Sequence, residues 1–106
     1  MAELLPLRPR IALPDPLWRH LVGDRLRRMR HARGETLADV ARRAGVSVQY
    51  LSEVERGLKE ASSEIVAAVL GALEGSLLDL TAGIADDLRA ATPSAPARVQ
   101  ALALAA

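Results

Sequence analysis

The sequence predicts an all-α fold, and three observations lead to this prediction. Half of the 106 residues are apolar, so the chain can build a core, yet it contains no Phe, one Trp and one Tyr. Leu and Ala favour helices, whereas the aromatic and β-branched residues that favour strands are sparse. Apolar residues also recur at the three- and four-residue spacing of helices along residues 16–91.

Composition divides the chain into three parts, and its length leaves room for one compact domain. Residues 1–15 are rich in proline, which removes a backbone donor and disfavours helix, so they are expected to form an extended arm. Residues 16–91 carry the helical periodicity and form the expected domain. Residues 92–106 contain a short linker with two prolines and then an Ala-rich tail.

Several functional classes conflict with the composition. The lack of cysteine excludes disulfides and thiolate metal sites, and it fits a reducing cytoplasm. No apolar stretch approaches the ~18 residues that span a bilayer, so no membrane partner is expected. His20 and His31 lie about 16 Å apart along one predicted helix, so they cannot share a catalytic site within a subunit. We therefore expect no enzyme, no cofactor and no metal.

The net charge of +1 conceals an asymmetry along the chain. Residues 17–60 hold ten basic and six acidic residues, a net charge of +4. Residues 61–106 hold two basic and five acidic residues, a net charge of −3. A basic half followed by an acidic half is typical of a domain with one surface facing phosphates, although a solvated helix face gives similar counts.

Five helices are expected, and the first covers residues 16–33. Asp15 is the expected N-cap, because its carboxylate accepts from free backbone amides in the first turn. Pro16 is the expected first helical residue, because its missing amide needs no partner there. Gly34 provides a left-handed residue that ends the helix.

The remaining helices carry start and stop signals of the same kind. Thr36 is expected to cap the second helix, with Asp39 completing a capping box and Gly45 ending it. Ser47 is expected to cap the third helix, which ends at Gly57. The fourth helix is expected to begin near Ser62 or Ser63 and to stop around Gly75, and the fifth to start at Ser76. The expected ranges of these helices are 37–44, 48–56, 62–75 and 76–91.

The expected second and third helices, with the turn between them, form a motif that indicates a function. The stretch TLADVARRAGVSVQYLSEVERG, residues 36–57, places Gly45 in a tight turn where a positive φ is needed. Ala41 is small where the next helix must cross closely, and apolar contacts fix the angle between the helices (Val40, Val46, Leu51 and Val54). This is a helix-turn-helix, in which the second helix enters the major groove of DNA and the first crosses the backbone.

With these residues, the sequence resembles the Xre/Cro-type regulators over residues 26–80. The run YLSEVERGLKEASSEIVAAVLGAL, residues 50–73, and the Ala-Ala end look like the actinobacterial regulators of Clp protease genes, the ClgR and PopR group. The resemblance implies a five-helix λ-repressor-like domain in a transcriptional regulator that activates Clp protease genes. It also implies double-stranded DNA, RNA polymerase and Clp protease as partners.

The first two turns of the third helix are expected to read base edges. Gln49 is the principal candidate, since an amide pairs bidentately with adenine. Val48 can contact a thymine methyl group, while Ser47 and Ser52 project on the same face. Glu53 either accepts from cytosine or pairs with a neighbouring arginine.

Phosphate contacts are expected around the edges of the groove. Regulators of this family usually have a phosphate-contacting Gln where this chain has Leu37, so that contact is either absent or made by Thr36. The remaining candidates are cationic or hydroxyl side chains on the first three helices and the loop after them (Arg27 or Arg28, Arg42, Arg43, Tyr50, Arg56 and Lys59).

Arg30 and Glu55 are predicted to form a partly buried, structural ion pair. Glu55 lies on a helix that otherwise faces phosphate, so an inward orientation is the consistent one. The resemblance implies the same arrangement, because regulators of this type pair such a Glu with an Arg of the first helix. Removing one partner would leave a buried charge without compensation.

The fifth helix carries an apolar stripe that either completes the core or forms a homodimer (Leu77, Leu80, Ile84 and Leu88). Two-fold symmetry would double the half-site read by one domain and give a palindromic operator. The chain ends in Leu104, Ala105 and Ala106, which form either an Ala-rich helix, an arm around the partner subunit, or a degradation signal similar to those read by Clp-type unfoldases. The alternative for the whole chain is a protein-binding helix-turn-helix module, such as an antitoxin or scaffold, without specific DNA recognition.

Overall fold

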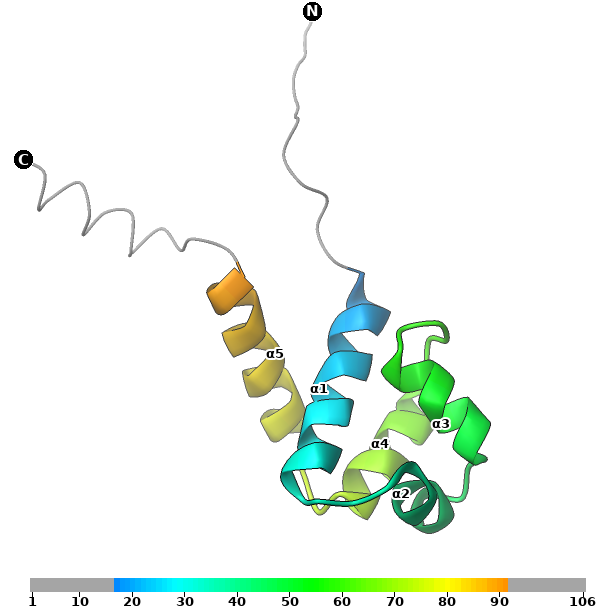
Figure 1. Cartoon of the computed structure of the whole chain (residues 1–106). Helices are drawn as coiled ribbons and strands as arrows, with labels where there is room; N and C mark the ends of the chain where they lie inside the picture. Colours follow the sequence, from blue (N-terminus) through cyan, green and yellow to red (C-terminus); the bar gives the residue numbers. More distant parts are fainter. Residues whose placement is uncertain (1–16, 92–106) are drawn as a thin grey trace, which may run out of the picture.

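The computed structural model describes residues 17–91. Within this range the chain forms five α-helices and no strand, which confirms the all-α prediction (Figure 1). The helices are α1 (Trp18–Ala32), α2 (Leu37–Ala44), α3 (Val48–Glu55), α4 (Ser63–Ala72) and α5 (Leu77–Ala91).

Helix α1 has a central position among the five. Helix α5 packs along α1, and α3 packs against α1 as well, while α2 packs against both α3 and α4. In Figure 1, α1 accordingly lies between α5 and α3. The helix-turn-helix pair and the last helix therefore both rest on α1.

The first helix starts later than the sequence predicted. Its N-cap is Leu17, which has extended backbone angles and makes no capping hydrogen bond through its side chain. The Leu17 carbonyl accepts from the backbone amides of His20 and Leu21, so the first helical turn is built on it. The prediction that Asp15 caps this helix is therefore wrong, and Asp15 and Pro16 themselves lie outside the described residues.

The predicted limits of α2 are confirmed. The Thr36 hydroxyl oxygen accepts from the Asp39 amide at 3.1 Å, and the Thr36 amide donates to the Asp39 carboxylate at 3.1 Å, which is a complete capping box. Gly45 ends the helix with φ 76°. Gly34 and Gly57 also adopt the positive φ expected of them.

The connection between α4 and α5 differs from the prediction. Helix α4 ends at Ala72, and the left-handed residue is Glu74 with φ 57°, not Gly75. The Gly75 amide reaches back to the Leu70 carbonyl at 2.8 Å, as in a Schellman ending. Gly75 packs on Met29, and a Cβ there would lie 2.6 Å from its terminal methyl, so the flexible end of that side chain would have to shift.

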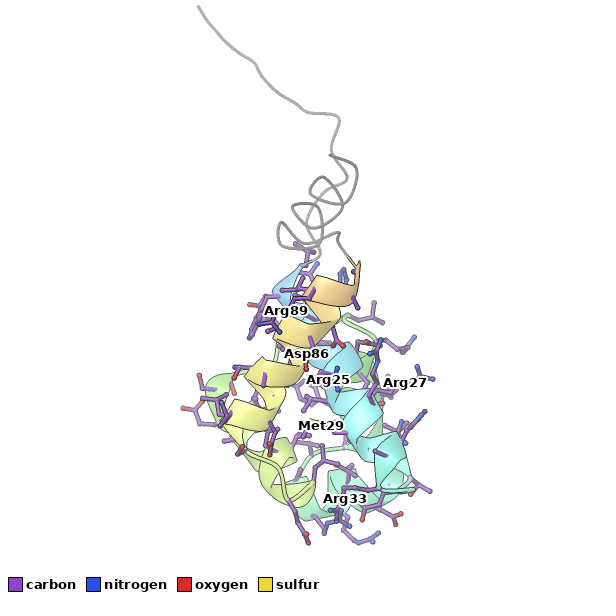
Figure 2. The ribbon with its side chains drawn as sticks, turned by 90° about the vertical axis from the view of Figure 1, so that its left-hand side faces the viewer. Arg25, Arg27, Met29, Arg33, Asp86 and Arg89 are labelled. Carbon is purple, nitrogen blue, oxygen red and sulfur yellow. The ribbon has the colours of Figure 1, made fainter. Side chains whose placement is uncertain are left out.

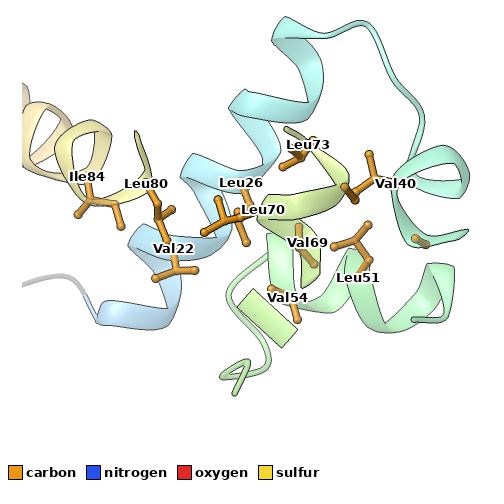
Figure 3. Close-up of a cluster of buried hydrophobic side chains, with 12 residues drawn as sticks. Val22, Leu26, Val40, Leu51, Val54, Val69, Leu70, Leu73, Leu80 and Ile84 are labelled. Carbon is orange, nitrogen blue, oxygen red and sulfur yellow. The ribbon is translucent and has the colours of Figure 1, made fainter. Parts of the chain in front are cut away.

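One continuous apolar core joins all five helices (Figure 3). Leu26 of α1 is fully buried, and Leu51 and Val54 of α3 are nearly so. The other core side chains come from α1, α2, α4 with its C-cap, and α5 (Val22, Val40, Ala41, Val69, Leu70, Ala72, Leu73, Leu80 and Ile84). This shared core fixes α2 and α3 relative to the rest of the domain.

Within residues 17–91, no single helix is long and apolar enough to cross a membrane. Helices α4 and α5 meet that test only as a pair, on length and composition alone, and they are bent by 97° at the break between them.

Candidate nucleic-acid interface

The turn between α2 and α3 is short, and the residues in it account for its backbone conformation. Gly45 adopts a left-handed conformation, and the next amide, that of Val46, donates to the Ala41 carbonyl at 3.0 Å. A Cβ at position 45 would meet no atom within 4 Å, so glycine is needed for its φ and not for space. Ser47 then caps α3 by accepting from the Tyr50 amide at 3.0 Å, as predicted.

Helix α3 presents its first turn to solvent and buries its other side. Ser47, Val48 and Gln49 are exposed, and nearly half of the Val48 surface is accessible. Leu51 and Val54 lie in the core. The candidate base-reading residues Ser52 and Glu53 are half-buried. The exposed first turn is therefore the part of α3 that can reach base edges in a groove.

Glu55 of α3 and Arg30 of α1 form a bidentate ion pair inside the domain. The Arg30 Nε donates to Glu55 Oε2 at 2.8 Å, and Arg30 Nη2 donates to Glu55 Oε1 at 2.9 Å. The two side chains are only 10% and 5% exposed. The hydrogen bonds that the Arg30 guanidinium donates to Glu55 raise its pKa. The pair proposed from the sequence is thus present, and it ties the C-terminal end of α3 to α1.

A glycine that the sequence interpretation left out allows this close contact. Gly23 lies in the middle of α1, and a Cβ there would lie 2.8 Å from the Glu55 carbonyl oxygen. Helices α1 and α3 therefore pack backbone to backbone at this point. An isolated glycine inside a predicted helix was the signal available in the sequence.

Arg43 does not have the free orientation that a phosphate contact needs. Its Nη2 donates to the Ala72 carbonyl at 2.8 Å and to Glu35 at 2.6 Å, and its Nε also donates to Ala72. The guanidinium thus satisfies the C-terminal end of α4, where carbonyls lack helical partners. These contacts give Arg43 a structural role, and we leave it out of the phosphate contacts proposed below.

The other cations remain near the surface around α3. Arg42 is exposed and lies 3.5 Å from Asp39, while Arg56 is exposed at the end of α3. The ammonium group of Lys59 lies 4.0 Å from the Glu53 carboxylate. This contact favours a charge-pairing role for Glu53 over a contact with cytosine, although its partner is Lys59 and not an arginine.

A cleft of ≈ 520 Å³ brings α1 and α3 to a common surface. Arg27 and His31 of α1 line it together with Ser52 and Arg56 of α3. Arg28, the other candidate on α1, is engaged by two carboxylates at 3.0 Å, those of Asp24 and of α5. Arg27 is therefore the better placed of the two arginines for contact with a phosphate.

Two carboxyl groups at the start of α2 have lowered pKa values. Hydrogen bonds from Arg33 and from Arg43 lower the pKa of Glu35. The Thr36 backbone amide donates to Asp39 and lowers the pKa of that carboxyl group. Asp39 therefore holds its negative charge in the first turn of α2, where the helix dipole favours an anion. The Thr36 hydroxyl accepts from α2 and keeps its own proton available for an acceptor such as phosphate.

The apolar stripe of α5 is divided between the core and the surface. Leu80 and Ile84 are 1% and 3% exposed and belong to the core of this domain, so their assignment to a dimer surface is wrong. Leu77 and Leu88 are 64% and 38% exposed. The candidate degradation signal, residues 104–106, lies outside the described residues.

Together, two short capped helices joined at a glycine turn, an exposed first turn on the second helix and cations around it define a helix-turn-helix DNA-binding domain with the λ-repressor-like fold. A family model described as a helix-turn-helix domain matches residues 21–82, more than half of the chain, and the chain therefore belongs to this family. Over this domain the chain is similar to the transcriptional regulator ClgR, and its relatives are transcriptional regulators, a non-enzymatic class.

The relatives agree with this classification. The chain is 52% identical over 58 residues to the transcriptional regulator ClgR of Mycobacterium tuberculosis, a match covering 55% of this chain and about half, 52%, of that protein. The crystal structure of the clp gene regulator ClgR from Corynebacterium glutamicum has a TM-score of 0.69 at 45% identity, over 74% of this chain and 85% of that one. The restriction-modification controller protein C.Esp1396I, solved as a tetramer with its natural operator, shares the fold, with a TM-score of 0.64 at 18% identity over 68% of this chain and 95% of that one.

Proposed function

We propose that this chain is a cytoplasmic, sequence-specific activator of Clp protease genes that binds a palindromic operator as a homodimer and acts with RNA polymerase. The likeness to ClgR carries the proposal, because the 45% identical neighbour is a clp gene regulator. The match includes both helices of the helix-turn-helix, since the family model extends over residues 21–82.

In the proposed complex, the first turn of α3 enters the major groove. Gln49 reads adenine, Val48 contacts a thymine methyl group, and Ser47 and Ser52 contact neighbouring base edges or the backbone. Phosphates bind to the side chains around this turn (Arg27, Thr36, Arg42, Tyr50, Arg56 and Lys59). The four cations among them give a slope of log K against log salt of about −4 for each protomer, by counterion release.

The direct test is a footprint on the promoters of Clp protease genes, followed by titration of the protected duplex at several salt concentrations. We expect protection of one palindrome and affinity that falls steeply with salt. Weak binding with equal affinity for all duplexes would contradict the proposal and would favour the protein-binding module instead. A reporter gene downstream of the protected site then separates activation from repression.

The homodimer is proposed to form through the exposed part of α5. Leu77 borders an apolar groove of ≈ 450 Å³ between α1, α4 and α5, and Trp18 at its rim is 53% exposed. Leu77 and Leu88 are eleven residues apart and therefore lie on nearly the same line along the helix. A second copy that packs on this face would cover both leucines and the tryptophan.

We predict that the double variant Leu77→Glu, Leu88→Glu is monomeric at micromolar concentration, whereas the wild-type protein is a dimer in sedimentation equilibrium. Both leucines are exposed in one protomer, so the variant keeps a cooperative thermal melt. Leu58→Glu is the matched control, because Leu58 is similarly exposed, at 59%, but lies in the loop after α3. A wild-type monomer under these conditions would overturn the dimer proposal.

The C-terminal residues Leu104, Ala105 and Ala106 are proposed to be a degradation signal for Clp protease. We predict that changing Ala105 and Ala106 to Asp lengthens the half-life of the protein in growing cells several-fold, because the apolar end is lost. The same two charges placed at Ala101 and Ala103 are the control. Equal turnover of all three proteins, or a change that persists in cells without Clp protease, would dismiss the signal.

A further inference from the structure

A cluster of charged side chains joins α5 to α1. Its central pair, Arg25 and Asp87, lies 62 residues apart in the sequence. Arg25 of α1 donates from Nε to Asp87 Oδ2 at 3.2 Å and from Nη2 to Asp87 Oδ1, and the same Nη2 donates to the Gly83 carbonyl at 3.1 Å. Arg28 adds a third donor to Asp87 at 3.0 Å. Figure 2 shows Arg25 on the side of α1 that faces α5. We call Arg25, Arg28 and Asp87 the α1–α5 clasp.

The clasp is partly buried and closely fitted. The side chains of Arg25 and Asp87 are 22% and 15% exposed, so this contact is better shielded from solvent than the other pair on α5. That pair, Arg89 with Asp86, is 68% and 73% exposed and spans one turn of the same helix. A Cβ at Gly83 would lie 2.6 Å from the Arg25 Nε, so the guanidinium crosses α5 close to the Gly83 backbone and would have to shift if a side chain were added there.

The clasp fastens the C-terminal half of α5, beyond Ile84, to α1, because this half contributes no side chain to the core. The buried side chains of α5 are Leu80 and Ile84, both in the region from its start to its middle. Beyond Ile84 the helix exposes most of its residues, including Leu88 of the proposed dimer face. Because α5 packs on α1, the bidentate contact of Arg25 with Asp87 restrains the angle between these two helices beyond the last core side chain.

Helix α1 thereby connects the recognition helix to the proposed dimer helix. Arg30 of α1 holds α3 through Glu55, and Arg25, five residues earlier, holds α5 through Asp87. Arg25 and Arg30 lie about 7.5 Å apart along α1, so a tilt of about 10° between α5 and α1 would move the α3 contact of each protomer by about 1.3 Å. In a symmetric dimer both α3 helices move, so their separation would change by up to about 2.6 Å, compared with a rise of about 3.4 Å for one base pair. In a symmetric dimer, the separation of the two α3 helices determines which half-site spacing fits.

We propose that the α1–α5 clasp determines the operator spacing that the dimer accepts, with Arg25 and Asp87 as positioning residues that do not touch DNA. This inference rests on the proposed function, since it requires a dimer formed through α5. It assigns to the clasp a role in specificity that is separate from base reading by α3.

The test uses the full-length protein and the duplex recovered by footprinting, with the half-sites moved apart or together by one and two base pairs. Wild-type protein is expected to bind one spacing at least tenfold more tightly than its neighbours. In Asp87→Asn this preference falls to about two- to threefold, while binding to a single half-site is unchanged. Asp86→Asn is the matched control, because it makes the same chemical change one residue away and outside the clasp.

A second pair of variants disturbs the clasp without removing a charge. Gly83→Ala places a methyl group against Arg25, and alanine favours a helix, so the variant is expected to fold. Gly71→Ala on α4 is its control, because a Cβ there meets nothing within 4 Å. We expect Gly83→Ala to shift or broaden the accepted spacing and Gly71→Ala to match wild type.

The geometry of the dimer can also be measured without DNA. The chain has no cysteine, so Glu60→Cys in the exposed loop after α3 provides one site for a spin label on each protomer. We expect a narrow distribution of distances between the two labels, and a distribution at least twice as wide when Asp87→Asn or Gly83→Ala is added. A purely stabilising role for the clasp would lower the melting temperature and leave this width unchanged.

The outcomes separate this inference from the function on which it rests. If wild-type protein is a monomer, or binds no palindrome, both the proposed function and the inference fail. If wild-type protein prefers one spacing and both Asp87→Asn and Gly83→Ala retain that preference as folded dimers, the clasp proposal alone is overturned. If only the clasp variants lose the preference and widen the distances, the proposal is supported.

Discussion

Replacing Glu55 with alanine is expected to lower the free energy of unfolding by about 3–5 kcal/mol. The carboxylate accepts two hydrogen bonds from Arg30, and both side chains are almost completely buried. Without Glu55, the guanidinium keeps its charge in a site with little access to water. A domain of this size loses roughly 4–8 °C of melting temperature for each 1 kcal/mol, so the melt should fall by more than about 12 °C.

The measurement is a urea unfolding curve followed by circular dichroism, together with a thermal melt. Glu53→Ala is the control, because Glu53 is two residues away on α3 and makes only a 4.0 Å contact with Lys59. Pairs near the surface, such as this one with side chains 53% and 23% exposed, contribute about 0–1 kcal/mol. A Glu55→Ala melt that coincides with that of the wild-type protein would show that the pair does not stabilise the fold.

A double variant separates the cost of an unpaired charge from the net contribution of the pair. Arg30→Met with Glu55→Leu replaces both members by apolar side chains, which is often neutral or stabilising when a buried pair is removed. We expect this variant to recover most of the stability lost in Glu55→Ala. Recovery would mean that the pair fixes the orientation of α3 more than it stabilises the fold.

Much of the fold could be predicted from the sequence because its signals are local. Thr36 and Asp39 complete a capping box with atoms three residues apart, so the start of α2 follows from spacing alone. The Gly45 turn is equally local. The same reasoning failed at the start of α1, where a good capping residue, Asp15, precedes a helix that is built on Leu17 instead.

The parts that could not be predicted depend on contacts between distant segments. Arg43 looks like a phosphate-binding residue in the sequence, and only the position of Ala72, 29 residues later, shows what its guanidinium binds. The contact of Arg25 with Asp87 has no sequence motif at all, since it depends on how α5 returns along α1. The glycines at 23 and 83 were visible inside predicted helices, but the carbonyl and the guanidinium that they accommodate were not.

Gln49→Ala is expected to remove discrimination at one base pair of each half-site. An amide that pairs bidentately with adenine contributes about 1–3 kcal/mol of discrimination, or roughly 5- to 150-fold in relative affinity for the correct base. Gln49 is exposed in the first turn of α3 and lies outside the core, so its loss should leave the thermal melt unchanged.

The experiment compares the footprinted duplex with variants in which each base pair of the half-site is changed in turn, all at one salt concentration. Wild-type protein should distinguish the adenine position, and Gln49→Ala should bind all four base pairs there within about twofold. Lys59→Ala is the control, because a lost phosphate contact weakens every duplex alike and reduces the salt slope by about 0.9 for each protomer. If Gln49→Ala weakened binding to every duplex alike, as expected of Lys59→Ala, the Gln49 amide would be binding the DNA backbone. Val48, Ser47 and Ser52 would then be the residues that read the bases.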